Sequence, residues 1–461
     1  MDDLRPKIQK ALAFPEESRS EAPRASREGS ESSRARPRRE SPAIPESLME
    51  EVLDRKNLEE ALRRVRANRG APGVDDMTVD ELAPYLREHW PTIRDQLSSG
   101  TYKPQPVKRV EIPKPDGGVR KLGIPTVLDR FIQQAVLQVL GRYWDPTFSE
   151  HSFGFRPQRS AHQAVAVAQG HLAEGYRWVV DIDLEKFFDR VNHDMLMGRV
   201  AKRVEDKRVL KLIRAFLNAG VMENGLVSSS EEGTPQGGPL SPLLSNIVLD
   251  DFDHELEKRG LRFARYADDC NVYVRSRRAG QRVMQSLTRF LTTKLKLKVN
   301  ESKSAVARPW ERKFLGFTFT SSREPKRRIA PKALIRFRER VRELTRRTRG
   351  VSLPQMVAQL SKYLTGWRGY YGFCQTPSVL RDLDSWIHRR LRAVVWKQWK
   401  RGRTRFAELT ARGIGKDLAA QTAGSPHGPW RLARSPALHF AFPTRLFDAF
   451  GLPRLLKTSE R

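Results

Sequence analysis

The chain has 461 residues, enough for two or three domains with buried cores. Its formal charge of +31, from 85 Lys and Arg against 54 Asp and Glu, favours a polyanionic partner, nucleic acid first, over a merely basic surface. Its two cysteines, Cys270 and Cys374, are far apart in the sequence and indicate neither a zinc site nor a disulfide framework. The absence of any roughly 18-residue apolar run or signal-peptide core predicts a cytoplasmic protein.

The N-terminal residues 1–44 are predicted to form a disordered tail that is basic and rich in Ser and Pro. After a short predicted helix over 4–14, the tract "EESRSEAPRASREGSESSRARPRRESP" has no aromatic residue and no aliphatic residue larger than Ala. Such a tract cannot bury enough apolar surface to become ordered. Two interpretations stay open, a contact with RNA through its arginines and a solvated extension without a role.

Helices and strands mix without a strict repeat over residues 45–322. Helices are predicted over 47–67, 79–97, 127–143, 160–173, most of 192–218, 239–257 and 279–297. "VKRVEIPKPDGGVRKLGIP" predicts a β-hairpin with a basic tip, and "GVMENGLVSSSEEGTPQGG" predicts a second hairpin. "YRWVVDIDLEKFF" predicts a strand that ends in charge, and "KFLGFTFT" predicts a closing strand. Because there is no strict βαβ repeat, the predicted fold class is α+β.

Beyond residue 323 the sequence predicts basic helices. In "PKALIRFRERVRELTRRT" apolar residues recur at helical spacing, and the other face is dense in arginine. Further helices over 354–365 and 379–400 would complete a helical domain, and 401–461 would form a small basic region that binds nucleic acid. A solvated face would carry both signs of charge, so RNA contact is favoured. The predicted RNA-binding residues are Arg336, Arg338, Arg342 and Arg346.

"RFARYADDCNVYV" places Asp268 and Asp269 between two predicted strands. Two unit charges roughly 4 Å apart repel by about 4 kcal/mol at an effective dielectric of about 20, so the pair needs compensation. Mg²⁺ supplies it, because this ion is held by a few carboxylates together with substrate phosphates. "VVDIDLEKFF" offers further acids, Asp181 and Asp183, on one face of a strand. An isolated Asp-Asp favours an exposed turn, so the neighbouring motifs decide.

Taken together, the motifs resemble the reverse transcriptases that bacterial group II introns encode. "IPKPDGGVRKLGIPTVLDR", "DIDLEKFF", "GTPQGGPLSPLLSNI" and "YADD" follow the family's order, and "YLTGWRGYYG" resembles its maturase region, also called domain X or thumb. The resemblance implies a right-hand polymerase, with fingers and palm over 45–322 and an α-helical thumb/maturase domain over 323–400.

The resemblance also implies an activity and its partners. It indicates an RNA-directed DNA polymerase of a bacterial group II intron that also binds intron RNA to assist splicing and mobility. The implied partners are RNA template, intron RNA, DNA primer or target and dNTPs, with the choice between monomer and dimer left open.

The family's metal-binding aspartates fall on Asp183, Asp268 and Asp269. The backbone carbonyl of Leu184 is implied to complete the shell of the second of two Mg²⁺ ions, for which Mn²⁺ is a substitute. Asp183 is preferred to Asp181 because of its spacing to the family's aromatic steric gate, which lies five residues after the metal aspartate.

The steric gate implied by this spacing is Phe188, which without the motif would be interpreted as an ordinary core aromatic. The other nucleotide-binding residues implied by the resemblance are Lys114 and Arg120 on the basic hairpin, Gln236 in the Gly-rich turn and Lys303 in "NESKS". Arg156 in "SFGFRPQRSAHQA" fits a fingers motif, but the sequence does not specify its contacts.

The sequence departs from many members of the family, which end in an HNH endonuclease built around cysteine pairs and histidines. No CxxC pair follows Cys374, so we expect a class C-like protein without that domain. Two alternatives stay open: a host-adopted group II-like polymerase in DNA repair or phage defence, and a non-catalytic splicing maturase that binds RNA. The clustered carboxylates argue against the second, since a vestigial site has no physical need for them.

Overall fold

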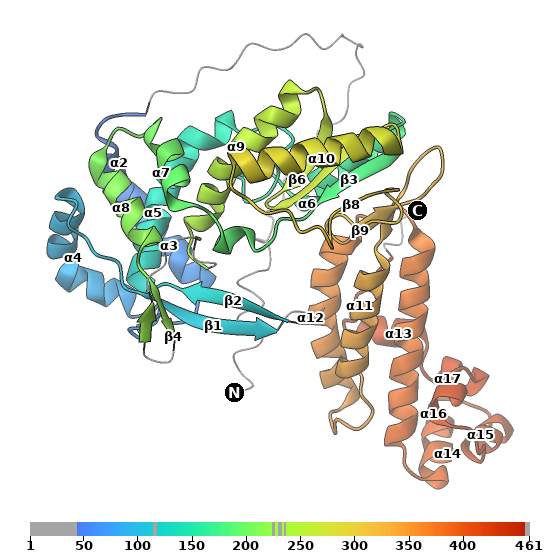
Figure 1. The fold of residues 1–461 in the computed structure, drawn as a ribbon. Helices are drawn as coiled ribbons and strands as arrows, with labels where there is room; N and C mark the ends of the chain where they lie inside the picture. Colours follow the sequence, from blue (N-terminus) through green and yellow to red (C-terminus); the bar gives the residue numbers. More distant parts are fainter. Residues whose placement is uncertain (1–43, 114–117, 224–225, 229–232, 235–236, 457–461) are drawn as a thin grey trace, which may run out of the picture. The chain divides into compact units, whose positions relative to one another are not determined.

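The structure is a computed structural model that describes residues 44–113, 118–223, 226–228, 233–234 and 237–456. The predicted N-terminal tail lies almost entirely outside these residues. The chain divides into two compact units, drawn in Figure 1. Unit 1 is Met1–Val167 with Trp178–Val306, and unit 2 is Ala168–Arg177 with Ala307–Arg461. Each unit has its own cluster of buried apolar residues.

Most of the predicted helices between residues 44 and 300 are confirmed. They are α2 (Leu48–Val52), α3 (Arg55–Asn68), α4 (Leu82–Ser98), α5 (Val127–Trp144), α6 (Ala161–Ala173), α7 (His193–Ala201), α8 (Lys207–Leu217), α9 (Ser241–Lys258) and α10 (Arg277–Lys294), with short 3-10 turns η1 (Asp145–Thr147) and η2 (Phe187–Asp189). The single helix predicted over 47–67 is wrong. Asp54 interrupts it, because its carboxylate accepts the backbone N–H groups of Lys56 and Asn57 and so caps α3.

Two four-stranded sheets organise the strands of this part of the chain. One has the order β2-β1-β4-β5, formed by β1 (Val107–Pro113), β2 (Val119–Ile124), β4 (Val221–Glu223) and β5 (Leu226–Ser228). The other has the order β6-β7-β3-β8, formed by β3 (Trp178–Ile182), β6 (Arg262–Tyr266), β7 (Asp269–Val274) and β8 (Ala305–Ala307). The predicted basic hairpin is confirmed as the antiparallel pair β1 and β2, although its tip, 114–117, lies outside the described residues.

A buried carboxylate fixes the base of this hairpin. Asp129, in the first turn of α5, accepts hydrogen bonds from the Tyr102 hydroxyl at 2.9 Å and from the Gln105 backbone N–H at 3.1 Å. Burial raises the pKa of Asp129 to about 6, and these hydrogen bonds oppose the rise. The chain is therefore tied to α5 immediately before β1 begins.

The sheet that contains β3 and β7 has two different faces. Val180 and Val274 belong to the face covered by α10, since a Cβ added to Gly280 would lie 3.3 Å from Val274 and 3.6 Å from Val180 (Figure 1). Successive side chains of a strand point to opposite faces. Asp181, next to Val180, therefore belongs to the face that α10 does not cover.

Unit 2 is mainly helical. Its strands are β9 (Phe317–Phe319) and β10 (Arg327–Ile329), and its helices are α11 (Pro331–Leu344), α12 (Leu353–Tyr371), α13 (Pro377–Gln398), α14 (Gly402–Ala411), α15 (Lys416–Ala423), α16 (Pro429–Leu432), α17 (Pro436–Ala441) and α18 (Thr444–Ala449). α12 extends beyond the end predicted at residue 365, because aromatic residues of its last turn pack on β9. The Phe317 ring centroid lies 5.5 Å from those of Tyr370 and Tyr371.

The predicted α+β class is confirmed by helices and mixed sheets in unit 1 and by the helices of unit 2. Among the described residues, no helix is both long enough and apolar enough to cross a bilayer.

Candidate active site

The "YADD" motif forms a tight hairpin between β6 and β7. Tyr266 pairs with Asp269 at the last rung, so Ala267 and Asp268 form the two-residue turn. Ala267 has φ 56°, a left-handed value that favours glycine and that a residue with a Cβ adopts at a cost. Surrounding contacts must therefore hold this turn in place.

The register of β3 and β7 brings Asp183 to the same place. Ile182 pairs with Cys270 in antiparallel register. The next position along both strands is occupied by Asp183 and Asp269, which point to the same face of the sheet. Asp181 shares this face, but it pairs with Asn271, farther from the turn. Two acids from distant parts of the sequence thus meet beside the hairpin turn.

The charge balance at Asp268 indicates which groups are near it. Burial raises the pKa of Asp268 above its usual range, and the charge of Asp183 raises it further. Its own backbone N–H and the charges of Arg120 and Arg265 lower this pKa in part. Arg120, on β2, is therefore close enough to the carboxylates for its charge to act on Asp268. The two arginines do not cancel the rise in the pKa of Asp268.

The residues around Asp183 are held by the segment 298–304. The Asp183 carbonyl accepts the N–H of Asn300 at 2.8 Å, and the Asp183 N–H donates to Ser304 Oγ at 3.0 Å. Leu184 forms an antiparallel bridge with Val299. Lys303 Nζ lies 3.9 Å from Asp183 Oδ2. Lys303, predicted to bind nucleotide, thus lies beside a predicted metal ligand as a counter-charge.

Phe188 lies in η2 and is half-buried, whereas the preceding Phe187 is buried. The two rings meet edge to face, with centroids 5.3 Å apart. The Phe188 carbonyl accepts the N–H of Thr234 at 2.6 Å, which ties this turn to the Gly-rich segment. In that segment a Cβ added to Gly237 would lie 2.5 Å from the carbonyl oxygen of Gly123, so glycine permits close approach of two protein backbones there.

Two predicted site residues, Lys114 and Gln236, lie outside the described residues, and their assignment stays a prediction. Within the described part of the chain, no three His, Cys, Asp or Glu side chains form a ready-made metal site. Mg²⁺ commonly uses one or two carboxylates with substrate phosphates and water, so the paired acids are compatible with it.

A buried arginine that the sequence motifs did not predict, Arg265, holds the turn from the covered side of the sheet. Arg265 is 1% exposed, and its Nε lies 2.7 Å from Asp253 Oδ1 of α9. The same guanidinium donates to the carbonyl of Ala267 at 2.9 Å, to Asn246 Oδ1 at 3.1 Å and to Ser152 Oγ at 2.7 Å. One side chain therefore ties the turn to α9 and to the loop around residue 152.

That loop also packs directly on the turn. A Cβ at Gly154 would clash with the backbone nitrogen of Ala267, so only glycine fits there. Arg156, whose contacts the sequence did not specify, is buried. Its guanidinium donates to the Asp145 carboxylate at 2.7 Å and to the Ser149 carbonyl at 2.6 Å. Arg156 thus anchors the loop.

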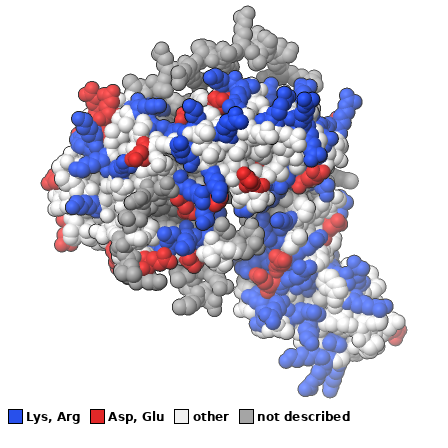
Figure 2. Space-filling view, in the orientation of Figure 1, with Lys and Arg blue, Asp and Glu red and all other residues white. Residues whose placement is uncertain are grey.

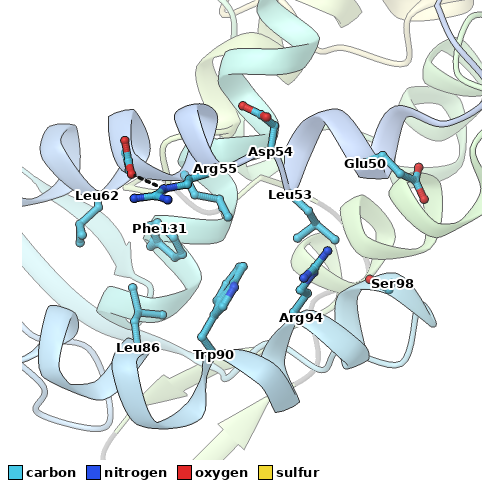
Figure 3. A pocket seen from close by; sticks show the side chains of 12 residues that line it. Glu50, Leu53, Asp54, Arg55, Leu62, Leu86, Trp90, Arg94, Ser98 and Phe131 are labelled. Carbon is cyan, nitrogen blue, oxygen red and sulfur yellow. Dashed lines mark hydrogen bonds and ion pairs between the residues drawn. The ribbon is translucent and has the colours of Figure 1, made fainter.

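A cavity of about 640 Å³ lies elsewhere in unit 1, among α2, α3, α4 and α5. Figure 3 shows apolar side chains such as Leu62, Trp90 and Phe131 on its walls, with charged groups such as Arg55 and Arg94 beside them. None of the predicted site residues lines this cavity, so it does not belong to the candidate active site.

Basic side chains predominate over the helices of unit 2 in the view of Figure 2. Arg336, Arg338 and Arg342 are exposed on α11. Arg346 is exposed as well, but α11 ends before it, so its predicted place on the helix face is wrong. The Arg342 guanidinium lies 5.9 Å from the ring centroid of Trp386, within the range of a cation–π interaction.

Comparison with known families finds matches for two segments of the chain. Residues 112–319 match the family Reverse transcriptase (RNA-dependent DNA polymerase), and residues 334–413 match Group II intron, maturase-specific domain. The chain carries a reverse transcriptase domain followed by a group II intron maturase domain. The resemblance predicted from the motifs is thereby confirmed, and so is the right-hand polymerase class.

Relatives of known sequence agree with these matches. Protein YkfC of Escherichia coli (strain K12) is 41% identical over 210 residues, which are 44% of this chain and 55% of that protein. The group II intron-encoded protein LtrA of Lactococcus lactis subsp. cremoris is 41% identical over 201 residues, 43% of this chain and 32% of LtrA. The aligned part thus spans about half of the first relative and about a third of the second.

Replacing Arg265 in the reverse transcriptase domain tests its part in holding the turn. Arg265→Met leaves Asp253 buried without its partner, so we expect the free energy of unfolding to fall by about 3–5 kcal/mol in urea denaturation. The double variant with Asp253→Leu removes the stranded charge and should recover part of this loss. A loss below about 1 kcal/mol in the single variant would contradict the role.

Proposed function

We propose that this chain is an RNA-directed DNA polymerase that uses two-metal nucleotidyl transfer and also binds group II intron RNA to assist splicing and mobility. The observation that carries the proposal is the meeting of Asp183 and Asp269 at neighbouring strand positions beside Asp268. The matched reverse transcriptase family spans all three. A chain with no use for a cation would gain nothing from bringing these acids together.

The chemistry of these residues fits Mg²⁺, with Mn²⁺ as a substitute. Carboxylate oxygens are the ligands that Mg²⁺ prefers, and burial, together with the charge of Asp183, raises the pKa of Asp268. We assign Asp183, Asp268, Asp269 and the Leu184 carbonyl as the ligands. Two bound ions would supply activation of a primer 3′-hydroxyl and stabilisation of the leaving oxygen.

The remaining residues have separate tasks in this proposal. Arg120, with Lys114, would hold the triphosphate, and the influence of Arg120 on the pKa of Asp268 supports its placement near the reacting phosphate. The half-buried Phe188 would lie against the sugar and exclude a 2′-hydroxyl. Gln236 and Lys303 would complete the contacts to the nucleotide and the template.

The maturase function rests on the second matched domain and on charge. The exposed arginines of α11 belong to a chain with formal charge +31, and guanidinium groups bind phosphates in a bidentate manner. Splicing is chemistry of the RNA itself. The protein's proposed part is to stabilise the folded RNA through these basic surfaces, in a reaction that does not involve the aspartates.

Asp269→Asn tests the polymerase and separates it from the splicing function. The change removes a proposed metal ligand with almost no change in volume, so RNA binding should persist. We expect primer extension on an RNA template to fall at least about 100-fold, the scale seen when one electrostatic stabiliser is lost. The measurement is cDNA yield from purified protein in Mg²⁺ and in Mn²⁺, with intron splicing assayed on the same sample.

The matched control is Asp181→Asn, which removes a carboxylate from the same sheet face two residue pairs farther from the turn. This control should retain extension within a few-fold of the unmodified chain, whereas Asp183→Asn should lose it. Equal loss in both, or full activity of Asp269→Asn, would show that the metal site lies elsewhere. An unmodified chain that makes no cDNA in either metal would refute the polymerase itself.

Phe188→Ala tests the steric gate. Removing the ring should admit ribonucleotides and reduce the preference for dNTP over rNTP roughly 10-fold or more, the range associated with one group in an apolar pocket. The measurement is the ratio of kcat/KM for the two nucleotides, with Phe188→Tyr as the variant that keeps the ring. Unchanged discrimination in Phe188→Ala would place the gate elsewhere and weaken the assignment of Asp183.

The arginines of α11 and the residues after it are tested by salt dependence. The triple variant of Arg338, Arg342 and Arg346 to Gln should weaken RNA binding and reduce the log–log salt slope by about 0.7–0.9 for each phosphate that is no longer neutralised. A control of equal charge loss replaces Arg55, Arg63 and Arg64, which form ion pairs with Glu59 or Glu60. Equal slopes in the two triple variants would show that net charge alone accounts for binding.

A further inference from the structure

An exposed aromatic ring lies beside the "YADD" turn. Phe155 is 51% exposed, and its ring centroid is 6.4 Å from that of Tyr266, with the planes tilted by 45°. Tyr266 is half-buried and pairs with Asp269 across the hairpin. The apolar ring of Phe155 is therefore exposed to solvent next to Tyr266, whose cross-strand partner, Asp269, is a proposed metal ligand.

The backbone of Phe155 is also unfavourable for a phenylalanine. Its φ of 60° lies in the left-handed region, which glycine adopts without strain and which is strained for a residue with a Cβ. Phe155 therefore lowers the stability of the folded chain in two ways, because its apolar ring is exposed to solvent and its backbone is strained. Costs of this kind are found at functional sites, where the surrounding structure imposes them.

The neighbours of Phe155 hold the ring in place. Gly154 packs on the backbone of Ala267, and its carbonyl accepts a hydrogen bond from Asn246 Nδ2 at 2.9 Å. On the other side, Arg156 is buried and hydrogen-bonded to Asp145. A ring fixed in advance loses little conformational freedom when a flat ligand stacks on it.

The position of the ring indicates which part of a substrate it meets. The sheet order β6-β7-β3 places Asp269 of β7 between two strands, with Phe155 beside β6 and the proposed gate Phe188 just after β3. In an in-line transfer the attacking 3′-oxygen of the primer and the leaving pyrophosphate oxygen lie on opposite sides of the reacting phosphate, so the primer terminus must lie next to the carboxylates. With the sugar of the incoming nucleotide against Phe188 beyond β3, the other side of Asp269, at β6, is left for the primer terminus.

We propose that Phe155, supported by Tyr266, is a stacking platform for the base at the 3′ end of the primer strand. This inference rests on the proposed polymerase function and adds a binding residue to it. The ligand is a nucleobase of any sequence, because every base has a flat π-face that stacks on an aromatic ring. The platform would hold the primer terminus in register with the carboxylates before each addition.

The test uses the full-length chain and a DNA primer with 2-aminopurine at its 3′ end, annealed to an RNA template, with no dNTP and no metal. Stacking alters the fluorescence of 2-aminopurine, so binding is measured without any chemistry. Phe155→Ala should bind about 5- to 150-fold more weakly, the factor that corresponds to loss of one base stack, and should lose the fluorescence change. Phe155→Tyr should retain both, and KM for dNTP should change little in either variant.

Phe155→Gly adds a stability measurement that separates a binding role from a structural one. Glycine relieves the left-handed backbone and removes an exposed ring, so Tm should stay the same or rise while primer binding falls. Gln158→Gly is the control, since Gln158 is also exposed, lies in the same loop and has φ 58°. It should change neither primer binding nor the fluorescence.

The outcomes separate this inference from the proposed function. If the unmodified chain extends primers and Phe155→Ala binds them equally well, the platform is refuted and the polymerase stands. If the fluorescence change moves to a 2-aminopurine at the templating position, or only KM for dNTP rises, Phe155 contacts another base and the proposal is overturned. If the fluorescence change is present but no extension occurs in Mg²⁺ or Mn²⁺, the polymerase proposal fails independently.

Discussion

The geometry of the site depends on the buried ion pair between Arg265 and Asp253. The turn that presents Asp268 contains Ala267 in a left-handed conformation, which the local sequence does not favour. The Arg265 guanidinium donates to the Ala267 carbonyl and fixes it from behind. A buried ion pair adds little net stability, because desolvation offsets the attraction, but it is costly to break. The role of this ion pair is therefore to hold the turn in position rather than to add stability.

The same guanidinium also acts on the charge of the site. It lies on the covered side of the sheet, while Asp183 and Asp269 lie on the other side, yet it lowers the pKa of Asp268. Arg120 acts in the same sense from β2. Together the two arginines do not cancel the rise in the pKa of Asp268 that burial causes. Burial thus disfavours the charged form of the Asp268 carboxylate, and a bound cation would offset that penalty.

Local patterns in the sequence were enough to predict most of the fold. The helices were found from apolar spacing, and the basic hairpin was found from alternation around Pro-Asp-Gly-Gly. The break at Asp54 was missed because helical periodicity continues across it, and only the cap hydrogen bonds to Lys56 and Asn57 reveal it. β8 was missed because three residues carry too little pattern to predict a strand. Arg346 was misplaced because the arginine pattern continues past the helix end.

The candidate site shows a similar division. The acids could be predicted because "YADD" and "DIDLEKFF" contain them as contiguous motifs. That Asp183 and Asp269 face each other depends on strand register, which neither segment specifies alone. The sequence also contains a signal for Arg265, which shares a strand face with Phe263, because a charge on that buried face requires an acidic partner. The partner, Asp253, comes from α9, so only the tertiary structure identifies it.

The contrast between Arg156 and Phe155 shows how this site divides stability from function. Arg156 is charged and buried, and its hydrogen bonds to Asp145 and Ser149 satisfy it within the protein. Phe155 is apolar and exposed, with a strained backbone and one neighbouring ring. Of these two adjacent residues, the charged one is buried and the apolar one is exposed, the opposite of what is usual in proteins. Burial of the arginine holds the loop, and the rigid loop in turn keeps the phenylalanine exposed, where its contact must come from a ligand.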